Sequence, residues 1–271
     1  MITAMTMVDR LIGSAPFIWE GDFAAGIARA AQLGYDGVEI HVADPAAIDQ
    51  AALADALKRH NIIVTAFGTG RAYVNEGLSL IDPDPEQLDA AIGRMDQFLE
   101  LGGRFGAKVI VGCMRGNVPD PKELPAALDK LADSMQHVDK VAGDNGVSVV
   151  FEPINRYENN FLCDMNSISE FIRERNLRNT GMLIDTFHMN IEEADMLASI
   201  RSCAPEIQYV HIADSNRRYP GEGHTDILSI IRTLKEVGYE GALSAECLPW
   251  PDLEGAQEGW IREVKQLLDR I

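Results

Sequence analysis

The segment LGYDGVEIH at residues 33–41 returns in similar form as VGYEGALSAE at residues 237–246. In each copy a glycine ends a helix-like pattern, a short turn follows, and an apolar strand closes on an acidic residue. The same alternation of an apolar run with an amphipathic helical pattern recurs along the chain. Such alternation predicts parallel strands that are joined by helices.

Eight apolar runs have the length and composition of buried strands. They lie at residues 10–15, 37–42, 62–67, 107–113, 147–152, 181–185, 208–213 and 242–247. Eight strand-and-helix units in 271 residues match the strand number and the usual size of a closed (β/α)8 barrel. We therefore expect an α/β protein with a single TIM-barrel catalytic domain over residues 1–271. A doubly wound open sheet is less favoured, because RLIGSAPFIWEGD (10–22) lacks the G-x-G-x-x-G spacing.

Helical periodicity fills the segments between these runs. The clearest pattern, at steps of four and three, comprises Leu124, Leu128, Leu131, Met135, Val138 and Val141. Two connections, at residues 67–84 and 153–165, are long for a compact barrel. We expect them to form walls of an active site at one rim.

Composition and charge exclude several classes of protein. The chain has 42 Asp and Glu against 24 Lys and Arg, a net charge of −18 that repels phosphate backbones and anionic lipids. It lacks an apolar run long enough to span a membrane, and MITAMTMVDR (1–10) does not resemble a secretory signal. Four scattered cysteines without a C-x-x-C pair fit a reducing compartment. We therefore expect a cytoplasmic protein without nucleic-acid or membrane partners.

Four consecutive predicted strands end on polar side chains. They are Glu152, Asp185, His211 and Glu246. Barrel enzymes place their chemistry at the rim where strands end, and buried carboxylates repel one another unless a cation lies among them. Three carboxylates and one imidazole suit Mn²⁺, or else Co²⁺ or Mg²⁺, whereas a structural zinc site would use more Cys or His. The sequence thus predicts a divalent metal site and indicates no organic cofactor.

Further polar residues follow the predicted strand ends in loops. Glu158, His188 and Arg217 lie just past the fifth, sixth and seventh strands, where a polar substrate can be held. Arg71 and Arg115 follow the third and fourth strands. A guanidinium binds a carboxylate through two parallel hydrogen bonds, so these arginines suggest a substrate with an anionic end. The alternative is that both pair with the abundant surface acids.

Three strings resemble a known family. They are FEPINRYENNFL (151–162), LIDTFHMNIEEA (183–194) and HIADSNRRYPGEG (211–223). Together with the glutamate of the last strand, they resemble the sugar isomerases and epimerases with a xylose isomerase-like barrel, above all the D-tagatose 3-epimerase-like ketose epimerases. The resemblance, which covers nearly the whole chain, implies that the four strand-end residues bind Mn²⁺ or a similar ion. It also implies that Glu152 and Glu246 are the catalytic pair and that Glu158, His188 and Arg217 contact the sugar.

Two further strings narrow the resemblance. FGTGRAYVNEGLSL (67–80) and AECLPWP (245–251) look more like the 5-keto-L-gluconate epimerase branch. The implied function is a metal-dependent epimerase that inverts C3 of a ketose or keto-uronate, of the 5-keto-L-gluconate, tagatose or ribulose type, through an enediolate. The implied partners are a small sugar or sugar acid and further copies of the chain, in a dimer or tetramer.

The sequence disfavours three other functions. An aldose–ketose or hydroxypyruvate isomerase on the same barrel would need a second metal, for which Asp214 and Glu39 show no recognisable ligand spacing. Glu39 and His41 on the second strand are interpreted instead as structural residues or as support for the site. A DNA-repair endonuclease of the AP-endonuclease type gathers zinc with many histidines, whereas this acidic chain has six. A sugar-binding module without catalysis would not explain two acids that flank one metal.

Overall fold

The computed structural model describes residues 1–10, 13 and 15–271 of the chain. Within these residues eight parallel strands close into a barrel, because β1 pairs with β3 on one side and with β9 on the other. The barrel strands are β1 (Ile2–Val8), β3 (Gly37–His41), β4 (Ile63–Gly68), β5 (Lys108–Val111), β6 (Val149–Phe151), β7 (Thr180–Asp185), β8 (Ile207–His211) and β9 (Ala242–Ser244). A two-residue strand, β2 (Trp19–Glu20), lies beside β1. The predicted α/β barrel is confirmed.

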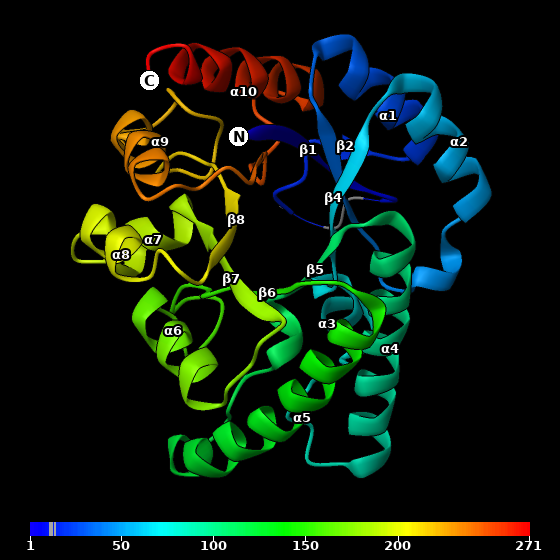
Figure 1. The fold of residues 1–271 in the computed structure, drawn as a ribbon, viewed down its shortest axis with the longest axis vertical. Coiled ribbons are helices and arrows are strands. Elements are labelled where there is room, and N and C mark those ends of the chain that lie inside the picture. The colour runs from blue at the N-terminus through cyan, green and yellow to red at the C-terminus, as the bar shows by residue number, and fades with distance from the viewer. Residues whose placement is uncertain (11–12, 14) are drawn as a thin grey trace.

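Helices form a ring around these strands (Figure 1). They are α1 (Phe23–Leu33), α2 (Gln50–His60), α3 (Gly70–Glu76), α4 (Pro85–Phe105), α5 (Leu124–Asn145), α6 (Met165–Glu174), α7 (Thr186–Glu192), α8 (Met196–Ser202), α9 (Ile227–Glu236) and α10 (Leu253–Leu268). Short 3-10 turns occur at η1 (Pro45–Ala47), η2 (Cys113–Arg115) and η3 (Pro121–Glu123). No helix in the described part of the chain is both long and apolar enough to cross a membrane.

The repeat seen in the sequence has the same conformation in both copies. Gly34 and Gly238 have positive φ angles of 82° and 83°, the left-handed conformation that ends a helix and that glycine adopts at little cost. After each glycine the chain turns into a barrel strand, β3 in the first copy and β9 in the second. The helical pattern predicted from Leu124 onward corresponds to α5, in which Leu131, Met135 and Val138 are buried.

The first strand is the one element that the sequence placed wrongly. The sequence predicts a strand at residues 10–15, but the strand is β1, which ends at Val8, before that range begins. Arg10, Gly13 and Ala15 lie outside any strand, and residues 11, 12 and 14 lie outside the described residues. Thr6 made the true strand look polar, yet its hydroxyl donates to the Ala245 carbonyl at 2.6 Å inside the protein. A buried threonine with a hydrogen-bond partner fits a barrel strand as well as valine does.

Side chains on the strands alternate between two apolar layers. The larger layer lies between strands and helices, and the smaller one fills the barrel interior. The interior layer comprises Ala66, Ile110, Val150, Leu183, Tyr209 and Ala242. Above Tyr209 the inward positions become polar, because His211 is the next inward residue of β8 and Glu39 lies beside it on β3. The interior of the barrel is therefore apolar in its middle and charged at the carboxyl ends of the strands.

Candidate active site

A cavity of about 330 Å³ opens at the carboxyl ends of the strands. That volume lies within the range of pockets that hold small molecules. The two long connections form part of its wall as predicted, the first through Arg71 and Asn75 and the second through Ile154 and Glu158. Phe17, whose ring lies 4.4 Å from that of His41, completes an apolar side of the wall.

The four predicted metal ligands converge at the bottom of this cavity, where Glu152 and Glu246 line it and Asp185 and His211 are buried beneath. Nδ1 of His211 lies 3.7 Å from Oε1 of Glu152, 4.0 Å from Oδ2 of Asp185 and 3.5 Å from Oε2 of Glu246. Glu152 follows β6 directly, Asp185 ends β7, His211 ends β8 and Glu246 lies two residues beyond β9. Asp185 and His211 are fully buried, and the two glutamates retain a small exposed surface toward the cavity.

The atoms that face the common centre are without partners. Oε1 of Glu152, Oδ2 of Asp185 and Nδ1 of His211 are all buried and make no hydrogen bond. Buried polar atoms are rarely left unpaired in native proteins, so three that face one point indicate a missing partner. An ion at about 2.1 Å from each ligand would separate neighbouring ligand atoms by about 3–4 Å, which is the spacing found here. The donor set therefore fits a divalent cation.

His211 is held from behind by a buried carboxylate. Its Nε2 lies 3.0 and 3.1 Å from the two oxygens of Glu39, which also accept from Nε2 of His41 at 2.5 Å and from the Tyr209 hydroxyl at 2.8 Å. Burial acts to raise the pKa of Glu39, but His211 and His41 outweigh it and hold the pKa far below its ordinary value. Glu39 is thus an anion that fixes the ring of His211.

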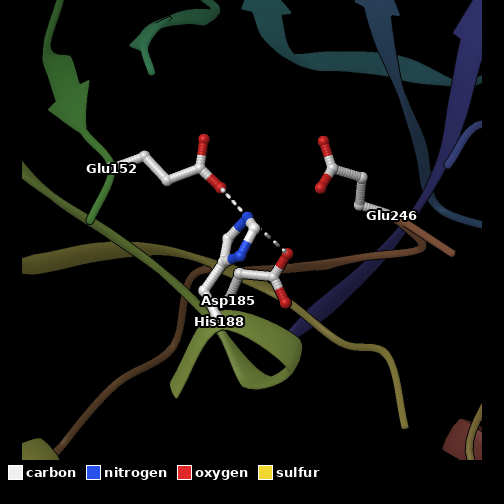
Figure 2. A group of neighbouring side chains, drawn as sticks. All are labelled: Glu152, Asp185, His188 and Glu246. Carbon is white, nitrogen blue, oxygen red and sulfur yellow. Dashed lines mark ion pairs between the residues drawn. The ribbon is translucent and has the colours of Figure 1, made fainter. Parts of the chain in front are cut away.

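A second histidine lies beside the same centre. Nε2 of His188, on α7, is 3.8 Å from Oε1 of Glu152 and 3.8 Å from Oδ2 of Asp185 (Figure 2). Its Nδ1 lies 2.7 Å from the side-chain amide nitrogen of Asn155. Burial, together with Arg217, holds the pKa of His188 well below its ordinary value, which favours the neutral form of the ring.

The two glutamates face each other across the centre from opposite sides (Figure 2). Burial raises the pKa of Glu152. Burial also acts to raise the pKa of Glu246, but His211 and Arg217 outweigh it and hold the pKa well below its ordinary range. The environment therefore separates the pKa values of the two carboxyl groups. Glu246 is the more readily ionised and Glu152 the more readily protonated.

Arg217 and Glu158 join this cluster at the cavity wall. Nη1 of Arg217 donates to Oε1 of Glu158 at 3.0 Å, and Nη2 donates to Oε2 of Glu246 at 3.1 Å. The guanidinium also lies 4.7 Å from the ring centre of Phe187. Both residues line the cavity, as does His188. The structure thus brings the three predicted sugar contacts together around the two glutamates.

The two arginines proposed for an anionic substrate end lie in different places. Arg71 lines the cavity; its Nη1 donates to the carbonyl of Arg10 and lies 3.5 Å from Asp9, and its buried Nε has no partner. Arg115 is fully buried and is not part of the cavity lining. It donates to the carbonyls of Glu152 at 2.8 Å and Leu162 at 3.1 Å. Arg115 therefore supports the end of β6 from below.

Three residues of the site were not singled out by sequence reasoning. Asn155 contacts His188, Gly112 approaches Glu152, and Cys113 lines the cavity. A Cβ atom on Gly112 would lie 2.7 Å from Oε2 of Glu152, so only glycine leaves room for that carboxylate. A glycine inside the predicted strand at residues 107–113 was the one available signal for such a close approach.

The fold and this site define an α/β-barrel protein with a carboxylate and imidazole centre at the carboxyl ends of its strands. The model of the xylose isomerase-like TIM barrel family matches residues 27–269. The chain belongs to that family, as its motifs predicted.

Relatives within the family are carbohydrate epimerases by name. The chain is 33% identical over 247 residues to the L-ribulose 3-epimerase of Methylomonas sp. (strain DH-1), across 86% of this chain and 83% of the relative. It is 32% identical to the ketose 3-epimerase of Arthrobacter globiformis, across 87% of this chain and 82% of the relative. The crystal structure of D-allulose 3-epimerase from Methylomonas sp. in complex with D-allulose superposes with a TM-score of 0.83 and 26% identity, over 98% of this chain and 96% of that one.

Proposed function

We propose that this protein is a metal-dependent epimerase that inverts C3 of a ketose or keto-uronate. Glu152 and Glu246 act as the acid–base pair, and the cation ligands are Glu152, Asp185, His211 and Glu246. The observation that carries the proposal is the pair of glutamates, which face each other across one centre and differ in the direction of their pKa shifts. The 3-epimerases among the relatives support the same chemistry.

Inversion at C3 requires a proton to leave from one face of the sugar and another to return on the opposite face. The hydrogen beside a ketone is weakly acidic, and its removal yields an enediolate with negative charge on oxygen. A divalent ion, with Mn²⁺ the first choice and Co²⁺ or Mg²⁺ the others, supplies electrostatic stabilisation for that charge when bound. Glu246, the more readily ionised group, takes the proton from one face, and Glu152 returns one from the other. The roles exchange in the reverse reaction.

The cavity wall holds the remainder of the substrate. Glu158, His188 and Arg217 surround the glutamates and present polar atoms to the sugar hydroxyls. Arg71 follows β4, which lies four strands from β8 around the ring of eight, so its side of the mouth is opposite His211. We therefore assign Arg71 to the end of the substrate that lies farthest from the reacting carbon. An anionic group at that end would satisfy its free donors.

An aldose–ketose isomerase with a second cation is less well supported. Asp214 accepts hydrogen bonds from the backbone N–H groups of Ser215, Gly221 and Thr225, which shape its own loop. The carboxylate of Glu39 already accepts hydrogen bonds from two histidines and a tyrosine. Neither carboxylate is free to hold a second ion.

Isotope exchange tests the proposal directly. The Mn²⁺-loaded protein is incubated in D₂O with a panel of ketoses and keto-acids, and products are analysed by NMR and chromatography. We expect deuterium at C3 and the C3 epimer of at least one substrate. An aldose product would instead indicate isomerisation, and the absence of deuterium at C3 across the panel would contradict the proposal.

A further inference from the structure

Two histidines face the same centre, and distance alone allows either to bind a cation. We propose that Glu39 and Asn155 are positioning residues that hold His211 and His188 in the same tautomer, with the proton on Nε2, but with opposite ring nitrogens toward the centre. His211 thereby offers a lone pair to the cation, and His188 offers an N–H group to the sugar. This inference rests on the proposed function only in that a cation and a sugar share the site.

Glu39 sets the tautomer of His211. A carboxylate accepts hydrogen bonds and donates none, so the Nε2 atom that lies 3.0 and 3.1 Å from its oxygens carries a proton. When the ring gives up its second proton to bind a cation, the lone pair is on Nδ1, the atom that faces Glu152, Asp185 and Glu246. Both His211 and Glu39 are fully buried and neither lines the cavity, so this arrangement lies beneath the substrate. A carboxylate behind a ligating histidine also orients the ring and makes it a stronger ligand.

Asn155 sets the tautomer of His188, whose Nε2 rather than Nδ1 faces the centre. Its Oδ1 accepts from the backbone N–H of Tyr157 at 2.9 Å, which fixes the orientation of the amide group. Its Nδ2 therefore donates, to Oε1 of Glu158 at 3.0 Å and to Nδ1 of His188 at 2.7 Å. Because Nδ1 accepts, the proton of the neutral ring is on Nε2. A nitrogen that carries a proton has no lone pair for a cation.

Nε2 of His188 has no acceptor at hydrogen-bond distance among the described residues, as expected for a donor that binds the substrate. Nη2 of Arg217, which is also a donor, lies 3.5 Å away, longer than the usual range of about 2.7–3.2 Å for a hydrogen bond from N–H. The nearest carboxylate oxygens, on Glu152 and Asp185, are 3.8 Å away. His188 lines the cavity, as Arg217 does. A sugar oxygen between these two groups would accept from both.

Matched variants separate the two roles. Mn²⁺ affinity is measured by calorimetry for Glu39→Gln, Asn155→Ala and Tyr209→Phe, and the folding of each is checked by circular dichroism. We expect Glu39→Gln to weaken Mn²⁺ binding by roughly 10–100-fold, the usual effect of losing such a carboxylate. Asn155→Ala should keep an affinity close to the wild-type value while its KM for the ketose rises. Tyr209→Phe is the control, since it removes one donor to Glu39 and leaves the His211 contact in place.

NMR gives a second readout that needs no turnover. Long-range ¹H–¹⁵N spectra of histidine-labelled protein with diamagnetic Mg²⁺ report which ring nitrogen is protonated. We expect His188 protonated at Nε2 in the wild type and a mixture of tautomers in Asn155→Ala. The proposal is wrong if His188 is protonated at Nδ1, or if Asn155→Ala weakens Mn²⁺ binding as much as Glu39→Gln does. It is equally wrong if Glu39→Gln binds Mn²⁺ normally, or if the wild type binds none. If the affinities and tautomers are as expected but no ketose exchanges its C3 hydrogen, the proposed function is wrong and the roles of Glu39 and Asn155 stand.

Discussion

Nη2 of Arg217 donates a hydrogen bond of 3.1 Å to Oε2 of Glu246. The same guanidinium contacts Glu158 and lies against the ring of Phe187, so its position is fixed from three sides. A permanent positive charge thus lies beside the proposed base. Together with His211, it holds the pKa of Glu246 well below its ordinary range despite burial.

Replacing Arg217 should change the pH dependence of the reaction. In Arg217→Met the pKa of Glu246 rises because its cationic neighbour is lost, and a smaller fraction of Glu246 is ionised in acid. We therefore expect the acidic limb of the kcat/KM profile to move to higher pH. Arg218→Met is the matched control, since that guanidinium stacks on Trp250, 3.8 Å from the ring centre. An unchanged acidic limb in Arg217→Met would show that Arg217 does not tune Glu246.

Removing the charge of Glu246 should stop proton transfer. We expect Glu246→Gln to lose at least about 10²-fold in kcat, the lower end of what a positioned acid–base group supplies. C3 exchange in D₂O should fall in parallel, while part of the Mn²⁺ affinity remains through Glu152, Asp185 and His211. The same change at the exposed Glu240 is the control. Normal exchange in Glu246→Gln would exclude it as the base.

A single methyl group at Gly112 should disturb the site. In Gly112→Ala the new Cβ would lie 2.7 Å from Oε2 of Glu152, so the carboxylate must move. We expect weaker Mn²⁺ binding and slower turnover. Gly93→Ala, on the exposed side of α4 with open space around it, should leave both unchanged and stabilise the fold by about 0.4–1 kcal/mol. If Gly112→Ala and the wild type bind Mn²⁺ with equal affinity, a Cβ at this position does not displace Glu152 from the site.

Cation binding should stabilise the folded state through Asp185. At a concentration of 100 times Kd, a ligand adds about 2.7 kcal/mol to the free energy of unfolding. We expect Mn²⁺ to raise the Tm of the wild type over its value in EDTA, but not that of Asp185→Asn. The variant in EDTA should unfold at the wild-type temperature or above, because one buried carboxylate is gone and asparagine can still cap α7 through Phe187 N–H. A full Mn²⁺ effect in Asp185→Asn would exclude it as a ligand.

Arg71 should decide between charged and neutral substrates. We expect the wild type to turn over 5-keto-gluconate with a higher kcat/KM than tagatose, fructose or ribulose. Arg71→Met should lower the ratio of kcat/KM for the keto-acid to that for a neutral ketose by roughly 10–100-fold, as expected when a hydrogen bond to a charged group is lost. A wild-type preference for neutral sugars would overturn the anionic assignment and leave the epimerase proposal intact.

The convergence of the four proposed metal ligands was predictable because each lies at or near the end of a strand. An apolar run that stops at Asp185 or just before Glu152 places that carboxylate at the barrel rim, whichever way the remainder of the chain folds. The first strand was missed because its threonines resemble a polar segment until their partners are known, as with Thr6 and the carbonyl of Ala245.

Contacts between distant parts of the chain were beyond sequence reasoning. Glu39 meets His211 across 172 residues, and Asn155 meets His188 across 33. Spacing along one strand or helix carries no information about such pairs. Arg115 illustrates the same point, because the rings of Phe151 and Phe161 draw its guanidinium into the interior, 5.7 Å from each ring centre. The position of Arg115 after a strand predicted a side chain in the cavity, but the side chain packs against two aromatic rings instead.

The four proposed ligands come from β6 to β9, which occupy one contiguous half of the ring, while Arg71 and Asn75 follow β4 in the other half. The groups proposed for proton transfer and the arginine proposed for the far end of the substrate are thus encoded in separate stretches of the gene. Exchange of the segment after β4 can therefore change which substrate end is accepted while every proposed ligand stays in place. That segment is the natural target for directed evolution toward other sugars.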